Sequence, residues 1–203
     1  MFVCTRAFQY NFDYAVLITI TCDKPYSNHR SSHKAMINPG NPSGNVMTHC
    51  DIQTITEFCS ENGIVMLADE VYQTNVYAPS AEFVSAKKVA MDCNLRELQL
   101  VSFHSTSKGL IGECGRRGGY MELHHIDPFV QSQLYKLASS ELCSGVVGQV
   151  MTSLMVNPPA PGDESYDQFK EENRRIFDGL KDRSQKLVEG LKPLRNANRS
   201  FNQ

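Results

Sequence analysis

Two short, mainly apolar runs stand out in the pattern of hydrophobic and polar positions, at residues 64–68 and 98–103. Each is too short for a helix and is typical of a strand buried in a parallel sheet. Residues 34–37 predict a further strand, which ends at the turn-forming segment 38–40. The two runs deliver Asp69 and the segment 105–108, respectively, to their carboxyl ends.

Helical patterns lie between and after these strands. Thr48 and Asp51 form a capping-box pattern before apolar residues at helical spacing, and Gly63 is placed to end that helix. Residues 82–91 also have a helical pattern, so strands and helices alternate, which favours an α/β architecture with a parallel sheet. Further helices are expected at 128–138, at 145–156 and, after a loop at 157–162, at 163–191.

Composition narrows the class of protein. The chain has 203 residues, of which 41% are hydrophobic, and a net charge of -2. This charge gives no basic field for nucleic acid. The apolar stretch at 15–20 is too short for a membrane span and lacks the basic flank of a signal peptide. We expect a soluble cytoplasmic protein with neither a nucleic-acid nor a membrane partner, although a mitochondrial location also fits.

The seven cysteines and the first 33 residues indicate no additional functional site. The cysteines form no CxxC pair, and their irregular spacing resembles neither a zinc site nor a disulfide framework, so we expect free thiols and no metal site. Residues 1–33 show no sustained period of either kind. They are expected to form an atypical segment rather than a packed element.

Polar residues whose side chains could bind the same ligand follow the predicted strands. Lys108, in STSKG, could form a Schiff base with an aldehyde if its surroundings desolvate the amine. Asp69, in ADEVY, could pair with a protonated pyridine nitrogen, and Tyr72 could direct its phenol at the same ligand. Taken singly, each has an ordinary alternative: a surface lysine, a helix cap or surface acid, and a half-buried structural tyrosine.

Two further segments could bind the polar parts of the same ligand. Asn41 lies in NPGNPSG, whose prolines and glycines could hold its amide in one orientation, although the composition alone indicates only a turn. Ser105, Ser107 and the arginines of GECGRRGG supply hydroxyl and guanidinium groups suited to a phosphate ester. Arg116 and Arg117 could equally be plain surface charge.

Four motifs in order, NPGNPSG, ADEVYQ, SFHSTSKG and GECGRRGGYME, together resemble the alanine aminotransferases, within the fold type I enzymes that depend on pyridoxal 5'-phosphate (PLP). SAKKV and LMVNPPAPGDESYDQF agree, so the resemblance covers roughly residues 34–191. It implies an α/β fold, a partial large domain of the fold type I PLP-dependent transferase fold, with a mostly parallel sheet flanked by helices.

The resemblance also implies a role for each matching residue. Lys108 would be the catalytic residue and form the Schiff base with PLP. Asp69 would pair with the pyridine nitrogen, and Asn41 and Tyr72 would hydrogen-bond the phenolic oxygen of the ring. The phosphate would be bound by Ser105, Ser107 and Arg117, with Arg117 preferred to Arg116.

The implied reaction transfers an amino group between L-alanine and 2-oxoglutarate, giving pyruvate and L-glutamate, in a homodimer. The expected division is an atypical segment at 1–33, a partial PLP-binding large domain at 34–160, and a long helix at 161–203 leading toward an absent small domain. Because motifs expected near both ends are missing, we expect a chain truncated at both ends. No residue that would bind the substrate carboxylate is visible.

Other interpretations stay open. The chain could be a catalytically inactive remnant that binds PLP or dimerises without turnover. Ser105 and Lys108 also fit the S-x-x-K pattern of a serine acyl-enzyme, although the companion S-D-N and K-T-G strings do not occur. A cysteine hydrolase built on Cys114 lacks its sequence context. His104 is interpreted as a packing or hydrogen-bonding histidine, and His124 and His125 as an exposed pair.

Overall fold

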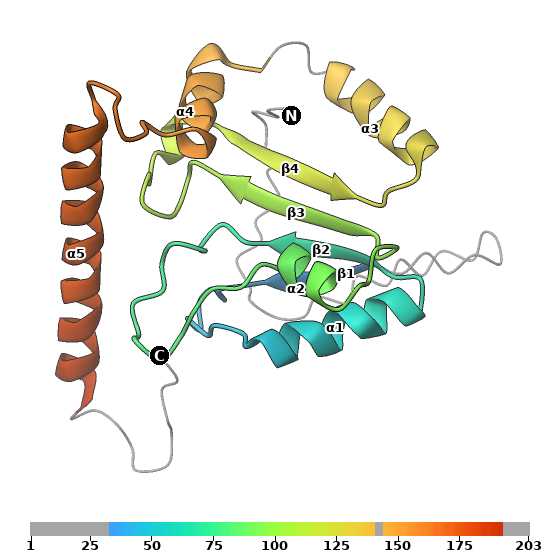
Figure 1. The fold of residues 1–203 in the computed structure, drawn as a ribbon, viewed down its shortest axis with the longest axis horizontal. Helices are drawn as coiled ribbons and strands as arrows, with labels where there is room; N and C mark the ends of the chain where they lie inside the picture. The colour runs from blue at the N-terminus through green and yellow to red at the C-terminus, as the bar shows by residue number, and fades with distance from the viewer. Residues whose placement is uncertain (1–32, 141–143, 193–203) are drawn as a thin grey trace.

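A computed structural model describes residues 33–140 and 144–192 of the chain (Figure 1). Its elements, in chain order, are β1 (His33–Ile37), α1 (His49–Glu61), β2 (Val65–Asp69), α2 (Ala86–Asp92), β3 (Leu100–Ser105), the 3-10 helix η1 (Cys114–Arg116), β4 (Gly119–His124), α3 (Pro128–Ser140), α4 (Val146–Val156) and α5 (Tyr166–Leu191).

The four strands form one sheet in the order β1-β2-β3-β4. The first three are parallel, with Ile37 beside Asp69 and Asp69 beside Phe103. The fourth runs antiparallel to β3 and places Tyr120 beside His104. The carboxyl ends of the three parallel strands therefore share one edge, on the side of the molecule where α5 stands (Figure 1).

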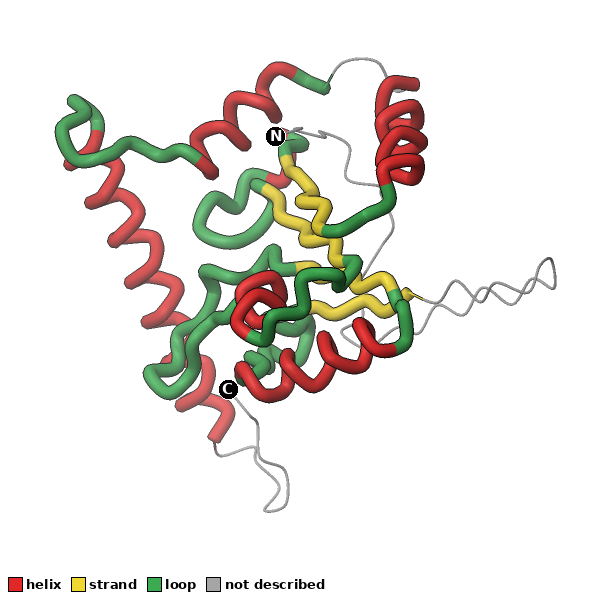
Figure 2. The backbone as a smooth tube through the Cα atoms, turned by 45° about the vertical axis from the view of Figure 1, so that its right-hand side comes forward, coloured by secondary structure: helices red, strands yellow, loops and turns green. Residues whose placement is uncertain are grey.

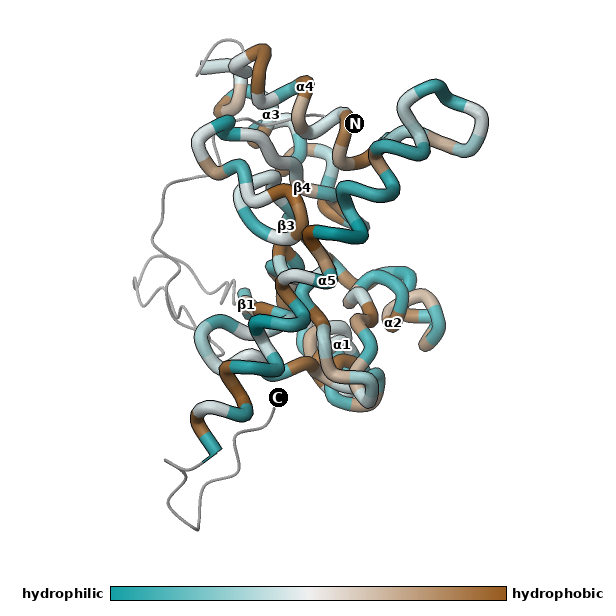
Figure 3. The backbone as a smooth tube through the Cα atoms, turned by 90° about the vertical axis from the view of Figure 1, so that its left-hand side faces the viewer, coloured by the Kyte–Doolittle hydropathy of each residue, from teal (hydrophilic) through white to brown (hydrophobic). Residues whose placement is uncertain are grey.

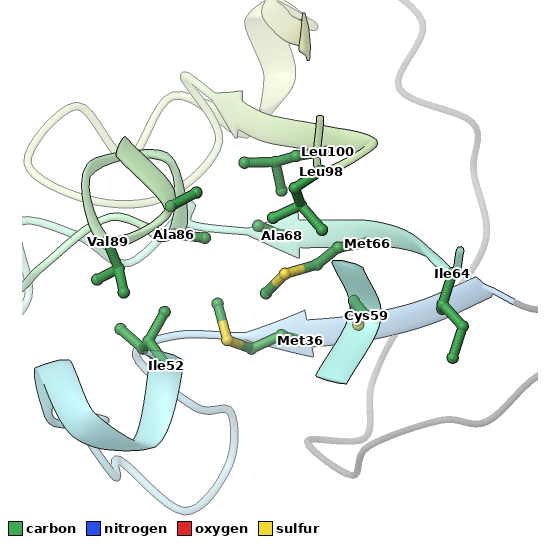
Figure 4. Close-up of a cluster of buried hydrophobic side chains, with 11 residues drawn as sticks. Met36, Ile52, Cys59, Ile64, Met66, Ala68, Ala86, Val89, Leu98 and Leu100 are labelled. Atoms are coloured by element: carbon green, nitrogen blue, oxygen red, sulfur yellow. The ribbon is translucent and has the colours of Figure 1, made fainter. Parts of the chain in front are cut away.

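The core lies between the sheet and helices α1 and α2, which pack on the same face of it (Figures 2 and 4). Met66 and Ala68 of β2 are fully buried there, together with Ile52 of α1 and Val89 of α2. Removing these apolar groups from water is the main favourable term that holds the layers together. This packing fixes β1, β2 and β3 relative to one another, and so fixes their carboxyl ends.

The three predicted parallel strands are confirmed, with bounds shifted by one or two residues. Asp69 is the last residue of β2, and Ser105 is the last residue of β3 rather than part of the loop beyond it. The predicted helix at 48–63 is confirmed as α1, and both hydrogen bonds of the Thr48–Asp51 capping box are present. The mostly parallel α/β architecture is therefore as predicted.

Strand β4 was not predicted from the sequence. Its first residue, Gly119, was interpreted only as part of a phosphate-binding loop, and its other residues alternate polar and apolar, as in a half-buried edge strand. Within it His124 is half-buried, and its Nε2 lies 3.2 Å from the Arg96 carbonyl oxygen. The prediction of an exposed pair is thus wrong for His124 and correct for His125.

The second predicted helix is shorter than expected. It begins at Ala86 instead of residue 82, because the Ser85 side chain accepts a hydrogen bond from the Lys88 amide and caps the helix there. The C-terminal helices occur as predicted, except that the last begins at Tyr166 rather than at 163. The residues before Tyr166 instead form a turn, in which the Asp163 carboxylate accepts a hydrogen bond from the Ala160 amide.

The long helix α5 contains no buried residue. Figure 3 shows it as mainly hydrophilic with hydrophobic residues at intervals, and its Leu187 side chain is 63% exposed. One of its aromatic residues, Phe177, contacts Tyr77 with ring centroids 5.6 Å apart. In the described part of the chain, no helix combines the length and apolar character that crossing a membrane requires.

Part of the predicted organisation lies outside the described residues. This holds for all but the last residue of the segment 1–33 and for residues 193–203. The division into a large domain at 34–160 and a following helix stays a prediction. The described cysteines, at positions 50, 59, 93 and 114, are all free, as expected.

Candidate active site at the carboxyl edge of the sheet

The loops that follow the parallel strands begin side by side at this edge. The Asn38 amide donates to the Asp69 carbonyl oxygen over 3.0 Å, and the Glu70 amide donates to the Phe103 carbonyl oxygen over 3.2 Å. These bonds extend the strand ladder by one residue past β1 and β2. The segments that follow the three parallel strands therefore all begin at one edge of the sheet, where open parallel sheets bind their ligands.

Asn41 and Tyr72 meet at this edge. The Asn41 amide nitrogen Nδ2 donates a hydrogen bond to the Tyr72 phenolic oxygen over 3.1 Å, although the two residues are 31 positions apart. Both side chains are half-buried. Because each retains further hydrogen-bonding capacity, the pair could donate jointly to one anionic oxygen of a ligand.

The loop that carries Asn41 is anchored by Asn38, a residue not predicted to matter. Asn38 is fully buried, and its Oδ1 accepts a hydrogen bond from the Met47 amide over 2.9 Å. Its Nδ2 is also buried and has no partner among the described residues. A side chain that spans its own loop holds that loop in one shape, so Asn38 positions Asn41. The sequence offers one indication of this role: Asn38 and Pro39 repeat the Asn-Pro pair found at residues 41 and 42.

Asp69 lies at the end of β2 and is half-buried. Burial raises the pKa of its carboxyl above the usual value, and a hydrogen bond from the Val71 amide, 3.2 Å from Oδ1, opposes this shift. The side chain is therefore neither a helix cap nor a plain surface acid. Its partly desolvated carboxylate could pair with a cationic group of a ligand.

The adjacent Glu70 is a buried acid that sequence reasoning did not single out. Its Oε1 accepts a hydrogen bond from the Ala86 amide over 2.7 Å and so ties β2 to the start of α2. Burial raises its pKa to about 7, with smaller contributions from Glu122 and Asp69. Only tertiary packing could reveal this, because two consecutive acids in a sequence normally indicate solvent exposure.

Lys108 lies in the turn that follows β3, and its side chain is exposed. The neighbouring Gly109 packs against the loop after β2, since a Cβ at Gly109 would lie 2.9 Å from the Thr74 Oγ1. Lys108 also lines a cavity of about 400 Å³ between this turn and helices α4 and α5. The residues that line this cavity include Lys108 but not Asn41, Asp69 or Tyr72.

His104 lines the same cavity and is a packing histidine, as predicted. Its ring meets Tyr120 edge-on, with centroids 5.9 Å apart. Burial lowers the pKa of the imidazole, which favours its neutral form. Burial also raises the pKa of the Tyr120 phenol, and Glu122 and Glu70 add to this rise. Both shifts favour the uncharged form of the side chain.

The predicted phosphate-binding residues come from two neighbouring segments. Ser105 ends β3, and its hydroxyl accepts a hydrogen bond from the Ser107 amide over 3.3 Å. Arg117 follows η1 in a left-handed conformation with φ 55°, and its guanidinium donates to the Cys114 carbonyl oxygen over 3.0 Å. Arg116 instead lies 3.5 Å from a Glu113 carboxylate oxygen. This pairing leaves Arg117 as the less neutralised of the two exposed arginines.

The chemistry of these donors fits PLP. The Asn41 and Tyr72 pair suits a phenolic oxygen, and the partly buried Asp69 carboxylate suits a pyridinium nitrogen. Hydroxyl and guanidinium groups at 105, 107 and 117 suit a phosphate. For the S-x-x-K alternative, the structure shows the Ser105 hydroxyl accepting from the Ser107 amide and, among the described residues, no hydrogen bond between Ser105 and Lys108.

Comparisons with known proteins show the family to which the chain is related. The family described as "Aminotransferase class I and II" matches residues 24–198. Alanine aminotransferase 1, mitochondrial, of Arabidopsis thaliana is 48% identical over 162 residues, which are 79% of this chain and 30% of that protein. Glutamate–glyoxylate aminotransferase 1 of the same plant is 45% identical over 164 residues, covering 79% of this chain and 34% of that protein.

The fold is similar to those of solved aminotransferases. Alanine aminotransferase from Pyrococcus furiosus superimposes with a TM-score of 0.66 at 20% identity, over 81% of this chain and 38% of that chain. The present chain spans about a third of the length of the curated relatives that it matches. Class I and II aminotransferases depend on PLP. With a match over 24–198, the chain belongs to the class I and II aminotransferase family.

Proposed function

We propose that this chain is part of a PLP-dependent transaminase that moves an amino group between L-alanine and 2-oxoglutarate, with pyruvate and L-glutamate as products. The observation that carries the proposal is the convergence of Asn41 and Tyr72 at the sheet edge that also ends in Asp69. The similarity to proteins named alanine aminotransferase supports the choice of substrates.

In this proposal each residue has a task in binding PLP. Lys108 bonds the aldehyde, and Asp69 holds the ring nitrogen in its protonated form. Asn41 and Tyr72 donate to the phenolic oxygen, while Ser105, Ser107 and Arg117 bind the phosphate. PLP, when bound, supplies an electron sink for the carbon that loses its proton.

The protein's own contribution is to move and place protons. The Lys108 amine, once displaced by the amino-acid substrate, acts as the general base for the α proton. Asp69 stays ionised opposite a positive charge, which offsets the rise in its pKa that burial alone produces. The donors at the phenolic and phosphate oxygens would hold the ring in one orientation relative to the Lys108 amine.

The binding test uses the visible absorbance of PLP bonded to an amine. We expect the purified chain to develop this band with PLP, and borohydride to fix the label on the peptide that contains Lys108. Lys108→Ala should abolish the band, whereas Lys136→Ala, on α3, should not. An unchanged band in Lys108→Ala would overturn the assignment.

The second candidate function is a PLP-binding or dimer-forming remnant without turnover. It is favoured by the exposure of the Lys108 side chain, because lysines that form Schiff bases are usually desolvated by their surroundings. Adding L-alanine with 2-oxoglutarate distinguishes the two: pyruvate formation supports the transaminase, and PLP binding without pyruvate supports the remnant. Glyoxylate should be tested as well, because relatives named glutamate–glyoxylate aminotransferase are almost as similar.

Two properties of the whole protein belong to the same proposal. We propose a homodimer, which sedimentation of the purified chain tests, since a monomer would count against a complete site. We also propose a cytoplasmic location, with the mitochondrion as the alternative because several similar relatives carry that word in their names. Fractionation of cells that express the full-length protein distinguishes the two compartments.

A further inference from the structure

The backbone of the Arg117–Gly118 turn and the first turns of helix α4 lie in direct contact. A Cβ atom at Gly148 would lie 2.5 Å from the Arg117 carbonyl oxygen and 3.0 Å from that of Arg116. A Cβ at Gly118 would lie 2.6 Å from both the Gly148 carbonyl oxygen and the Thr152 Oγ1. Only glycine allows so close an approach at these two positions.

Two fully buried threonines surround this contact. The Thr106 amide and hydroxyl both donate to the Gly118 carbonyl oxygen, over 3.0 and 3.1 Å. The Thr152 hydroxyl donates to the Gly148 carbonyl oxygen over 2.8 Å. On the N-terminal side of the turn, the Glu113 amide donates to the Thr106 carbonyl oxygen over 2.9 Å. Thr106 thus bonds both sides of the segment that carries Arg117.

The same cluster holds Arg117 in an uncommon conformation. With φ 55° its backbone is left-handed, which is unfavourable for a residue with a side chain and persists only where the surroundings impose it. The carbonyl of Arg117 faces Gly148, and the next residue is bonded to Thr106. The surroundings that impose the conformation are therefore α4 on one side and Thr106 on the other.

We propose that Gly148 and Thr106 are positioning residues that hold Arg117 beside Ser105 and Ser107. The arginine and the two serines can then bind one phosphate together. Thr106 lies between the two serines in sequence, and its buried hydroxyl bonds the segment that presents the arginine. Gly148 lets α4 rest on the Arg117 backbone and close off its other conformations. This inference rests on the proposed function, since it concerns the phosphate of PLP.

The first test compares PLP with pyridoxal, which lacks the phosphate. Gly148→Ala should displace Arg117 and raise the dissociation constant for PLP by about tenfold or more, the effect of losing a charge-assisted bond. The constant for pyridoxal should change by less than about twofold. Gly115→Ala is the control, because it adds the same methyl group in η1, two residues before Arg117, where the added Cβ meets no atom within 4 Å.

The second test keeps the shape and removes only a hydrogen bond. Thr106→Val should weaken PLP binding more than pyridoxal binding, and Thr106→Ser, which restores the hydroxyl, should recover it. The Thr106 amide still donates to Gly118 in both variants, so both should fold. This pair decides the inference if Gly148→Ala does not fold. Equal losses for the two ligands would indicate a merely structural role and overturn it.

The third test needs no cofactor. Amide hydrogen exchange in the ligand-free chain should accelerate at Thr106 and Glu113 in Gly148→Ala and stay unchanged in Gly115→Ala. If the unsubstituted chain binds no PLP, the proposed function fails, and the exchange comparison alone then decides the positioning role. Unchanged exchange at both amides in Gly148→Ala would overturn that role.

Discussion

The side-chain amide of Asn41 donates a hydrogen bond to the phenolic oxygen of Tyr72 over 3.1 Å. This bond joins the loop after β1 to the loop after β2, the strand that ends at Asp69. Two loops distant in sequence thus contribute to one site, which makes the residues around this bond the natural places to test the site.

Tyr72→Phe should weaken PLP binding by about threefold to tenfold, the usual effect of losing one hydrogen bond. The measurement is titration of the visible band in purified protein. Tyr77→Phe is the matched control, because the Asn75 amide donates to its phenolic oxygen over 2.8 Å in the same way, outside the proposed site. Equal effects of the two substitutions would contradict the proposed role of Tyr72.

Asp69→Asn should leave PLP bound to Lys108 but slow the reaction of the complex with L-alanine by about 100-fold, as expected for loss of a preorganised electrostatic contact. The neutral amide retains an oxygen that can accept from the Val71 amide, so the fold should persist. Stopped-flow absorbance after adding L-alanine measures the rate. Asp92→Asn, at the exposed end of α2, should have no effect, and a normal rate in Asp69→Asn would exclude the pairing role.

The buried Glu70 predicts how stability depends on pH. Its pKa is raised from 4.5 to about 7 in the folded protein, so the folded state holds this proton more tightly than the unfolded state. Its contribution to stability is therefore fully present below pH 4.5 and is lost as the pH rises toward about 7. The loss amounts to about 3 kcal/mol, at about 1.4 kcal/mol for each pKa unit.

Glu70→Gln should remove this dependence, because the amide oxygen can still accept from the Ala86 amide and carries no charge. Urea unfolding at pH 5 and pH 8 measures it: the substitution should stabilise the protein at pH 8 and have little effect at pH 5. Glu97→Gln, at an exposed position, should behave like the unsubstituted chain at both values. A parallel pH dependence in Glu70→Gln would show that another group is responsible.

The capping box of α1 predicts a local contribution to stability. Thr48→Ala removes the hydroxyl that accepts from the Asp51 amide over 3.2 Å, and should cost about 1 kcal/mol of unfolding free energy. Thr54→Ala is the control, since that hydroxyl donates to the Cys50 carbonyl within the same helix and should be close to neutral. Urea denaturation of both variants gives the comparison.

Local sequence patterns determined the three parallel strands and the cap of α1. A strand inside a parallel sheet is apolar along most of its length, and a cap needs a side chain of one type at one spacing. The strand that contains Met66 and Ala68 and the Thr48–Asp51 pair are therefore visible in the sequence. The same strands place Asp69 at their carboxyl edge, which is why that residue could be identified as a candidate before its surroundings were known.

Tertiary structure decided the features that leave no periodic pattern of hydrophobic residues in the sequence. Strand β4 is held by pairing with β3, and its mixed sequence gives little signal of its own. The Asn41–Tyr72 bond, the burial of Glu70 and the contact of Gly148 with Arg117 join residues 16 to 31 positions apart, and packing alone sets their distances. The sequence by itself determined which groups reach the edge of the sheet, and the packing of the loops and α4 decided which of them meet.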